Sequence, residues 1–299
     1  MADSEEAKPS KGKVFVQRLG STTFLYGVLM VSLFSSNQRL SLIAFGGLIT
    51  LFGVLGMMEL YGMAEKRYLK PFRELGIAIG VALIGSTFWA LGIQKNPDLA
   101  FDIEIAILLC TVPVLGVAQI RRYTDEDKSS LGPLAVTLFG IIYVALLLNV
   151  LQKIRYFPDF QGHWWLMFFI VVSKMSDTGA YCTGQLIGRT KMIPRVSPGK
   201  TWEGFAGGIV FSVVAAWLFV HFADTPFKNV PLAHALGLGV VLGVGSVLGD
   251  LVESLFKREA GMKDSGSFFP SVGGILDILD SLLFNAPLMY LYLKYILPS

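Results

Sequence analysis

The segment from 250 to 281 concentrates acidic and basic side chains of the kinds that handle phosphate groups. Its acids and cations are Asp250, Glu253, Asp264, Asp277 and Asp280, and Lys257, Arg258 and Lys263. Carboxylate oxygens are the ligands that a hard cation such as Mg²⁺ prefers, and Mg²⁺ usually also binds substrate phosphates. Lysine and arginine can hold the remaining phosphate charge. This composition therefore predicts a metal-assisted phosphate site.

A second polar segment, RVSPGKTWEGFAGG, contains the last three letters of a phosphate-binding P-loop, Gly199-Lys200-Thr201. A P-loop needs a glycine five positions earlier, and Pro194 stands there, so the segment is not a P-loop. We expect a basic turn that leads into a helix. Ser197, Lys200 and Thr201 would contact phosphate there, and the helix N-terminus would add N–H groups.

Two charged residues also interrupt an apolar run. Lys174 and Asp177 are three apart and so share one helical face; they either neutralise each other or leave Lys174 to contact a lipid phosphate. The three histidines fall at the far ends of the predicted spans, which argues against histidine chemistry near the polar segments. Phosphoryl chemistry fits this restriction, because an anionic phosphate nucleophile needs alignment and charge neutralisation rather than a base.

Long apolar runs must position these side chains. Of 299 residues, 53% are hydrophobic and 16% charged, against roughly 25% charged in soluble domains. A membrane crossing takes about 20 helical residues, and unbroken apolar runs do not suit a barrel. We predict an all-α polytopic membrane protein with about nine transmembrane helices. The expected spans are 19–35, 40–58, 75–93, 103–120, 131–151, 164–187, 204–223, 232–255 and 275–297.

The basic residues predict the orientation of these spans. Eighteen of the 25 Lys and Arg fall in the N-terminal segment and every second segment after it, six fall in the other segments, and Lys174 lies inside a span. The positive-inside rule then predicts a cytosolic N-terminus, an outside C-terminus and cytosolic polar loops. We expect a cytosolic tail at 1–18, N-terminal membrane helices at 19–160 and a catalytic half at 161–299, in a bacterial plasma membrane.

Glycine recurs at close spacing in the run at 232–255. The pairs Gly239/Gly243 and Gly245/Gly249 have the small-xxx-small spacing that lets helices approach closely. If this run and the last one form an antiparallel pair, Asp250 ends at a depth similar to that of the acids that begin the last run. Close packing would then hold a metal site together.

Two stretches of the chain resemble the phosphatidate cytidylyltransferases, also called CDP-diacylglycerol synthases. They are SDTGAYCTGQLIGRTKMIPRVSPGKTWEGFAGG, from Ser176, and SLFKREAGMKDSGSFFPSVGGILDILDS, from Ser254. The second is similar to the family signature S-x-x-K-R, K-D, P-x-H-G-G-x-x-D-R-x-D. The resemblance implies that CTP and phosphatidate react, with Mg²⁺, to give CDP-diacylglycerol and pyrophosphate. CTP, phosphatidate and membrane lipids are the implied partners; no nucleic acid is expected, and a homodimer is one expected assembly.

The resemblance also implies roles for individual residues. Expected catalytic residues are Lys257, Lys263, Asp264, Asp277 and Asp280. From their places at facing helix ends rather than from the signature, the expected metal ligands are Asp250 and Asp277, with Asp280 or Asp264 assisting. Expected substrate-binding residues are Asp177, Ser197, Lys200, Thr201, Arg258, Gly273 and Gly274.

Two positions depart from the signature. Val272 replaces the histidine before Gly-Gly, and Ile278 replaces the arginine after the first aspartate. Losing a charged contact costs about 2 to 5 kcal/mol, so a catalytically silent relative is one alternative. A kinase or cytidylyltransferase for another lipid is a second. A transporter with its acids along an ion path is a third, but the gathering of acids with Lys and Arg on one side favours an enzyme.

Overall fold

The chain passes through a helical bundle nine times in the part described by the computed structural model, which covers residues 11–123, 131–157, 161–223, 227–228, 230–266 and 273–297. Two of the passes contain a π-helical stretch. The helices are α1 (Lys11–Phe34), α2 (Gln38–Glu65), α3 (Arg73–Phe88) with η1 (Trp89–Ile93), α4 (Pro97–Arg122), α5 (Leu131–Gly140) with η2 (Ile141–Leu146) and α6 (Leu147–Arg155), α7 (Gly162–Ile187), α8 (Trp202–Phe222), α10 (Leu232–Glu259) and α11 (Ile275–Tyr295).

Each of the nine predicted spans falls largely within one of these passes. Among the described residues, seven passes have the length and hydropathy of a membrane span. The other two are α1, whose apolar part is the shorter Thr23–Phe34, and α7, which carries Lys174 and Asp177. The prediction of a mostly helical, polytopic membrane protein is confirmed.

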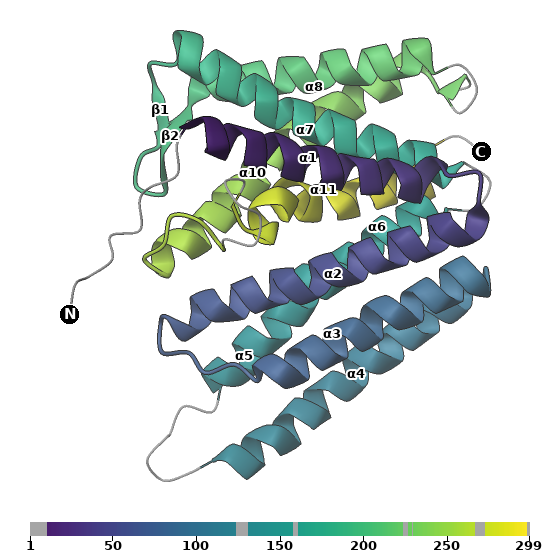
Figure 1. Ribbon diagram of the computed structural model, residues 1–299, viewed down its shortest axis with the longest axis vertical. Helices are drawn as coiled ribbons and strands as arrows, with labels where there is room; N and C mark the ends of the chain where they lie inside the picture. The colour runs from purple at the N-terminus through teal and green to yellow at the C-terminus, as the bar shows by residue number, and fades with distance from the viewer. Residues whose placement is uncertain are drawn as a thin grey trace.

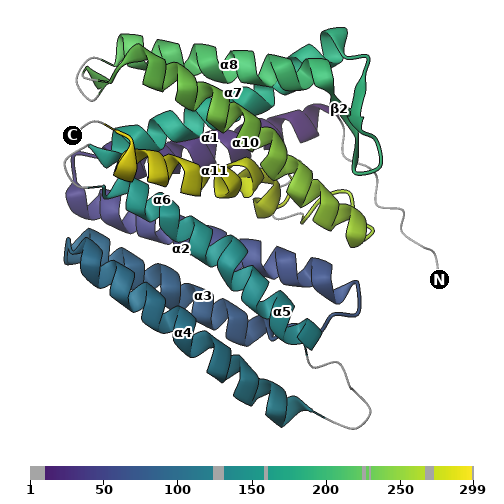
Figure 2. The same cartoon turned by 180° about the vertical axis from the view of Figure 1, so that it is seen from behind.

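The helices lie roughly alongside one another, and the polar loops gather at one end (Figure 1). α7, α8 and α10 pack together, while α11 lies against α10 on one side and against α2 and α6 on the other (Figure 2). α11 thus joins the catalytic half expected at 161–299 to the N-terminal helices. Its first turn lies at the same end as the last turns of α2 and α10.

Glycines on α10 let this helix approach its neighbours closely, as the small-xxx-small spacing of the glycines predicted. A Cβ atom on Gly239 would lie 2.7 Å from the backbone of Val213 in α8, and one on Gly249 would lie 2.5 Å from the carbonyl oxygen of Asp280 in α11. Polar side chains add contacts between the helices: Asn285 of α11, fully buried, donates to the Leu242 carbonyl of α10 at 2.8 Å. These contacts fix α10 and α11 side by side next to Asp250.

A two-stranded hairpin, which the sequence analysis did not predict, precedes α8. Strands β1 (Lys191–Ile193) and β2 (Ser197–Thr201) are antiparallel, with Lys191 opposite Thr201. The Thr201 hydroxyl accepts the Gly204 N–H at 3.1 Å and so caps α8. Gly199-Lys200-Thr201 therefore lies in strand β2 and not in the expected turn, because these residues pair with β1, and the hairpin holds them at the loop end of the bundle.

Candidate active site

Three carboxylates from α10 and α11 converge at the loop end of the bundle. One oxygen each of Asp250, Glu253 and Asp280 lies within 4.8 Å of the others. Glu253 and Asp280 are buried, and Asp250 is partly exposed. Mg²⁺ binds carboxylate oxygens at about 2.1 Å, so the three side chains would have to move closer together to share one ion.

Glu253 provides an independent test of whether this centre suits a cation. Its Oε2 atom accepts a hydrogen bond from Lys257, but its Oε1 atom is buried and has no hydrogen-bond partner among the described residues. An unpartnered buried carboxylate oxygen is costly. A cation bound between Glu253, Asp250 and Asp280 would satisfy it, so the residues present fit a hard divalent ion.

Asp277 occupies a different position from the one expected of a ligand shared with Asp250. The Lys257 ammonium lies between Glu253 and Asp277, 2.7 Å from an oxygen of each. The other Asp277 oxygen accepts hydrogen bonds from the Gly274 N–H at 2.7 Å and the Ser265 hydroxyl at 2.9 Å. Asp277 therefore caps its own helix and orients Lys257. The shared Asp250–Asp277 ion stays a prediction, and the contacts favour Glu253 and Asp280 as partners of Asp250.

Glu59, near the end of α2, is a site residue that the sequence analysis missed. Its two carboxylate oxygens accept the N–H groups of Ile275 and Leu276, each at 2.9 Å, and one also accepts the Ser265 hydroxyl at 3.1 Å. Glu59 thus binds the N-terminus of α11, where a negative charge is favourable. The available signal was an acid immediately after an apolar run, which is also what an ordinary flanking charge looks like.

Lys200 of the hairpin reaches the acidic centre. Its ammonium lies 2.9 Å from an Asp250 oxygen and donates to the Val247 carbonyl at 3.0 Å. A polar cavity of about 360 Å³ lies beside this pair. Five predicted site residues line it: Asp177, Ser197, Lys200, Thr201 and Asp250. Strand β2 and Asp250 therefore face one space, which is large enough for phosphate groups.

Lys174 of α7 pairs with Asp177, as the spacing of the two residues predicted, and it also connects α7 to α11. Its ammonium lies 3.1 Å from Asp177, 3.0 Å from the Ser281 hydroxyl and 3.8 Å from Asp280. It also borders a narrow, otherwise apolar cavity that Ile278 lines as well. Lys174 is thus placed between the acidic centre and an apolar space.

The remaining predicted site residues have other positions. Arg258 is exposed and donates to the carbonyls of Val196 and Met262, so it fastens the hairpin to the end of α10. Lys263 and Asp264 are exposed on the loop after α10.

The glycines of the signature lie directly before α11. Gly273 has a φ of 112°, which favours glycine, and Gly274 is the N-cap of the helix. A Cβ on Gly274 would lie 2.5 Å from Glu59 Oε2, so this glycine gives Glu59 access to the helix N-terminus. Val272 lies outside the described residues.

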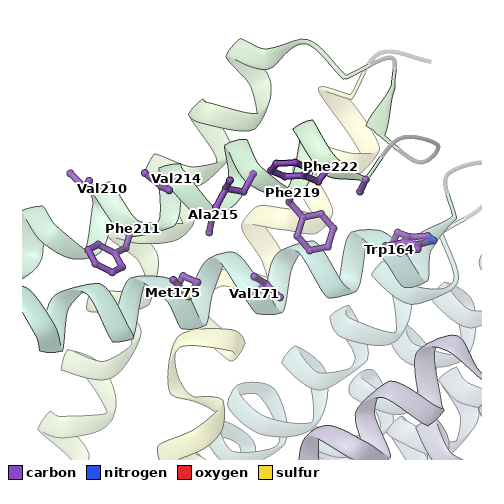
Figure 3. Close-up of a pocket in the computed structure, with 11 residues that line it drawn as sticks. Trp164, Val171, Met175, Val210, Phe211, Val214, Ala215, Phe219 and Phe222 are labelled. Carbon is purple, nitrogen blue, oxygen red and sulfur yellow. The ribbon is translucent and has the colours of Figure 1, made fainter.

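A groove of about 640 Å³ between α7 and α8 differs sharply from this site. Met175, Val171 and Trp164 of α7 face Phe211 and neighbouring side chains of α8 (Figure 3). All of its lining residues are apolar or aromatic. It offers no group that could bind phosphate or metal, so the chemistry belongs to the polar cavity.

The charge balance of the connected site residues points to a cation. Hydrogen bonds, ion pairs and the three-carboxylate cluster link six carboxylates with three lysines among the described residues. The carboxylates are Glu59, Asp177, Asp250, Glu253, Asp277 and Asp280, and the lysines are Lys174, Lys200 and Lys257. With all six carboxylates ionised, this set carries three more negative than positive charges, which a bound cation would offset beside a triphosphate.

Comparison with known proteins agrees with this chemistry. The chain matches the Cytidylyltransferase family over residues 16–296. It is 30% identical over 305 residues to a phosphatidate cytidylyltransferase of Chlamydia pneumoniae, with 98% of this chain and 97% of the relative covered. It is 33% identical over 280 residues to a phosphatidate cytidylyltransferase of Bacillus subtilis, with 94% and 91% covered. Matched over nearly all of its length, this chain belongs to the cytidylyltransferase family.

Proposed function

We propose that the protein transfers CMP from CTP to phosphatidate, which gives CDP-diacylglycerol and pyrophosphate. An oxygen of the lipid phosphate forms a bond to the α-phosphorus of CTP, and the bond to the β-phosphate breaks. The observation that carries the proposal is the convergence of Asp250, Glu253 and Asp280 beside Lys174 and Lys200. This centre lies in a chain whose relatives are named for this activity.

We assign Mg²⁺ binding to Asp250, Glu253 and Asp280. Their oxygens are hard ligands, and the unpartnered Glu253 oxygen supports the assignment. When bound, Mg²⁺ would neutralise charge on the triphosphate and on the departing pyrophosphate. Asp277 then acts through Lys257, which it holds at 2.7 Å. Removing either partner would leave the other charge poorly compensated.

The polar cavity is the proposed site for the triphosphate of CTP. Lys200 can exchange its contact with Asp250 for a phosphate oxygen, and Ser197 lines the same space. The Thr201 hydroxyl already caps α8, and the Trp202 N–H donates to the Thr190 carbonyl, so the role of Thr201 is to order the first turn of that helix. Arg258 contributes by holding the hairpin in place.

Phosphatidate is proposed to approach from the apolar cavity that Lys174 borders. The cavity has a volume of about 70 Å³ and is lined mainly by apolar side chains, so it would have to widen to admit an acyl chain; Lys174 is its one cationic lining residue in the described ranges. A lipid phosphate near Lys174 would lie beside Asp280 and hence beside the proposed metal centre. This arrangement brings an anionic nucleophile and a triphosphate to one place, which is the main requirement of the reaction.

We further propose that the loop end faces the cytosol of a bacterial cell and that the protein resides in the plasma membrane. The support is the excess of Lys and Arg in the segments at this end, since CTP is a cytosolic metabolite. The division at residues 18 and 160 and the homodimer likewise remain proposals.

The decisive assay uses the purified full-length chain in detergent with Mg²⁺, phosphatidate and CTP labelled in its α-phosphate. Label should enter the lipid phase together with stoichiometric pyrophosphate, and Asp277→Asn should abolish both. Label that stays aqueous with a well-folded protein would refute the proposal. Replacing phosphatidate with dolichol tests another lipid acceptor, and γ-labelled ATP tests a kinase. Activity with only one of these would select that alternative.

A further inference from the structure

A second polar cavity lies at the end of the bundle opposite the acidic centre. It has a volume of about 460 Å³ and lies between the first turns of α2, the π-helical η1 and the end of α6. One of its lining residues, Ser41, precedes Glu59 by 18 residues on α2, which is about 27 Å at 1.5 Å per residue. The cavity is therefore separate from the site of the proposed transfer, and what it binds does not depend on that function.

The cavity contains a guanidinium group without a counter-charge. Arg155, the last residue of α6, donates from Nη2 to the Ser41 hydroxyl at 2.7 Å. Its Nε and Nη1 atoms are buried and have no hydrogen-bond partner, and it forms no ion pair, within the described ranges. It lies 4.4 Å from the ring centroid of Phe45 and 5.2 Å from that of Tyr156.

Those aromatic contacts attract the cation but do not neutralise it. A partly buried charge that lacks a carboxylate partner is costly in a membrane protein. In such settings arginine pairs with carboxylate or phosphate groups, which accept two of its N–H bonds in parallel. An anion in the adjoining cavity would provide the missing partner.

The other lining groups suit the headgroup of a phospholipid. Lys95 is the second charged lining residue, so both charges of the cavity are positive. Its φ of 53° is unusual for a residue other than glycine, and such strained backbone is concentrated at binding sites. Ser35 and Gln38 add hydrogen-bonding groups, and Leu91 provides an apolar wall on η1. π-Helical stretches are themselves frequent at functional sites.

The surroundings favour a lipid over a soluble anion. Ile43 and Ile93, close in sequence to lining residues, are 72% and 58% exposed, and Leu40 is 49% exposed. Exposed aliphatic side chains on membrane-spanning helices face lipid. We propose that this cavity binds the phosphate of an anionic phospholipid from the leaflet at this end of the bundle, with Arg155 and Lys95 neutralising it.

The test compares dioctanoyl-phosphatidylglycerol, dioctanoyl-phosphatidylcholine and inorganic phosphate as probes of the purified full-length protein in neutral detergent. Binding is followed by native mass spectrometry, and the site is located by hydrogen–deuterium exchange of residues 35–42 and 91–97. The variants are Arg155→Gln, Lys95→Gln and, as a matched control, Arg39→Gln. Arg39 is exposed at the start of α2 and does not line the cavity.

Phosphatidylglycerol should bind the wild type at least tenfold more tightly than phosphatidylcholine and should slow exchange in both segments. Arg155→Gln should weaken this binding at least tenfold and Lys95→Gln severalfold. Arg39→Gln should bind phosphatidylglycerol as tightly as the wild type does. All three variants should keep the wild-type CMP-transfer rate. Lys95 lies on a surface turn, so its variant keeps the test valid if Arg155→Gln does not fold. Equal binding of the two lipids, or unchanged binding in both cavity variants, would refute the proposal. If inorganic phosphate binds as tightly as phosphatidylglycerol, the ligand of the cavity is a soluble anion, and the proposal of a lipid ligand is refuted.

Discussion

Lys174 of α7 and Ile278 of α11 line the same narrow cavity, and the Lys174 ammonium lies 3.8 Å from Asp280. Ile278 stands where the signature of the resembling enzymes has arginine, and Lys174 introduces a charge into an apolar run. The positive charge that α11 lacks at position 278 is therefore present on α7, at Lys174. This relationship explains how the departure at position 278 is compatible with an active site.

The first prediction follows from this exchange of charge. Lys174→Met should lower kcat/KM for phosphatidate by about 30-fold or more, because one charged contact to phosphate is lost. Adding Ile278→Arg to that variant should recover a large part of the loss, since the new guanidinium enters the same cavity. Steady-state kinetics on the two variants and on Ile278→Arg alone would measure this. A double variant no more active than Lys174→Met would show that the two positions are not interchangeable.

The second prediction separates the proposed metal ligands from Asp277. Asp250→Asn and Asp280→Asn should raise the Mg²⁺ concentration for half-maximal activity at least tenfold, because each removes a charged oxygen from the cluster. Asp277→Asn should abolish turnover at every Mg²⁺ concentration while the protein stays folded, because it releases Lys257. Mg²⁺ titrations of the three variants provide the comparison. Rescue of Asp277→Asn by excess Mg²⁺ would instead support an ion shared by Asp250 and Asp277.

The third prediction concerns the contact between α2 and α11. Glu59→Gln should reduce kcat about tenfold or more and destabilise the protein by about 1.5 to 3 kcal/mol, because charged hydrogen bonds to Ile275 and Leu276 are weakened. Thermal unfolding and kcat measure the two effects. Glu65→Gln is the matched control, since Glu65 lies exposed on the same helix and pairs with Arg73 at 3.6 Å. Equal behaviour of the two variants would remove Glu59 from the site.

The fourth prediction tests the close approach of α10 and α11. Gly249→Ala should destabilise the protein by about 1 to 3 kcal/mol, because its new methyl group would lie 2.5 Å from the Asp280 carbonyl oxygen. The helices must separate next to the three carboxylates, so the Mg²⁺ requirement should rise as well. Gly237→Ala is the control on the same helix, where a Cβ meets nothing within 4 Å. A Gly249→Ala protein with wild-type stability and Mg²⁺ dependence would contradict the packing argument.

Much of the architecture could be predicted from sequence because lipid restricts the backbone so strongly. An apolar run of about 20 residues has to form a helix when no water can satisfy its N–H and C=O groups. The nine runs, the glycine spacing on α10 and the i,i+3 pair of Lys174 and Asp177 are properties of single helices, and all three are confirmed. The hairpin was missed because β1 and β2 are only three and five residues long, too short for an alternating pattern.

The partners within the site depended on the tertiary structure. Periodicity says which side chains share a helical face, but it does not say how one helix is rotated against another. That rotation directs Asp280 toward Asp250 and Glu253, and Asp277 toward Lys257. It also brings Glu59 to the start of α11 across more than 200 residues of sequence. The sequence alone determined which chemical groups the loop end would contain, whereas helix packing decided which carboxylates could share an ion, because that depends on distances of a few ångströms between separate helices.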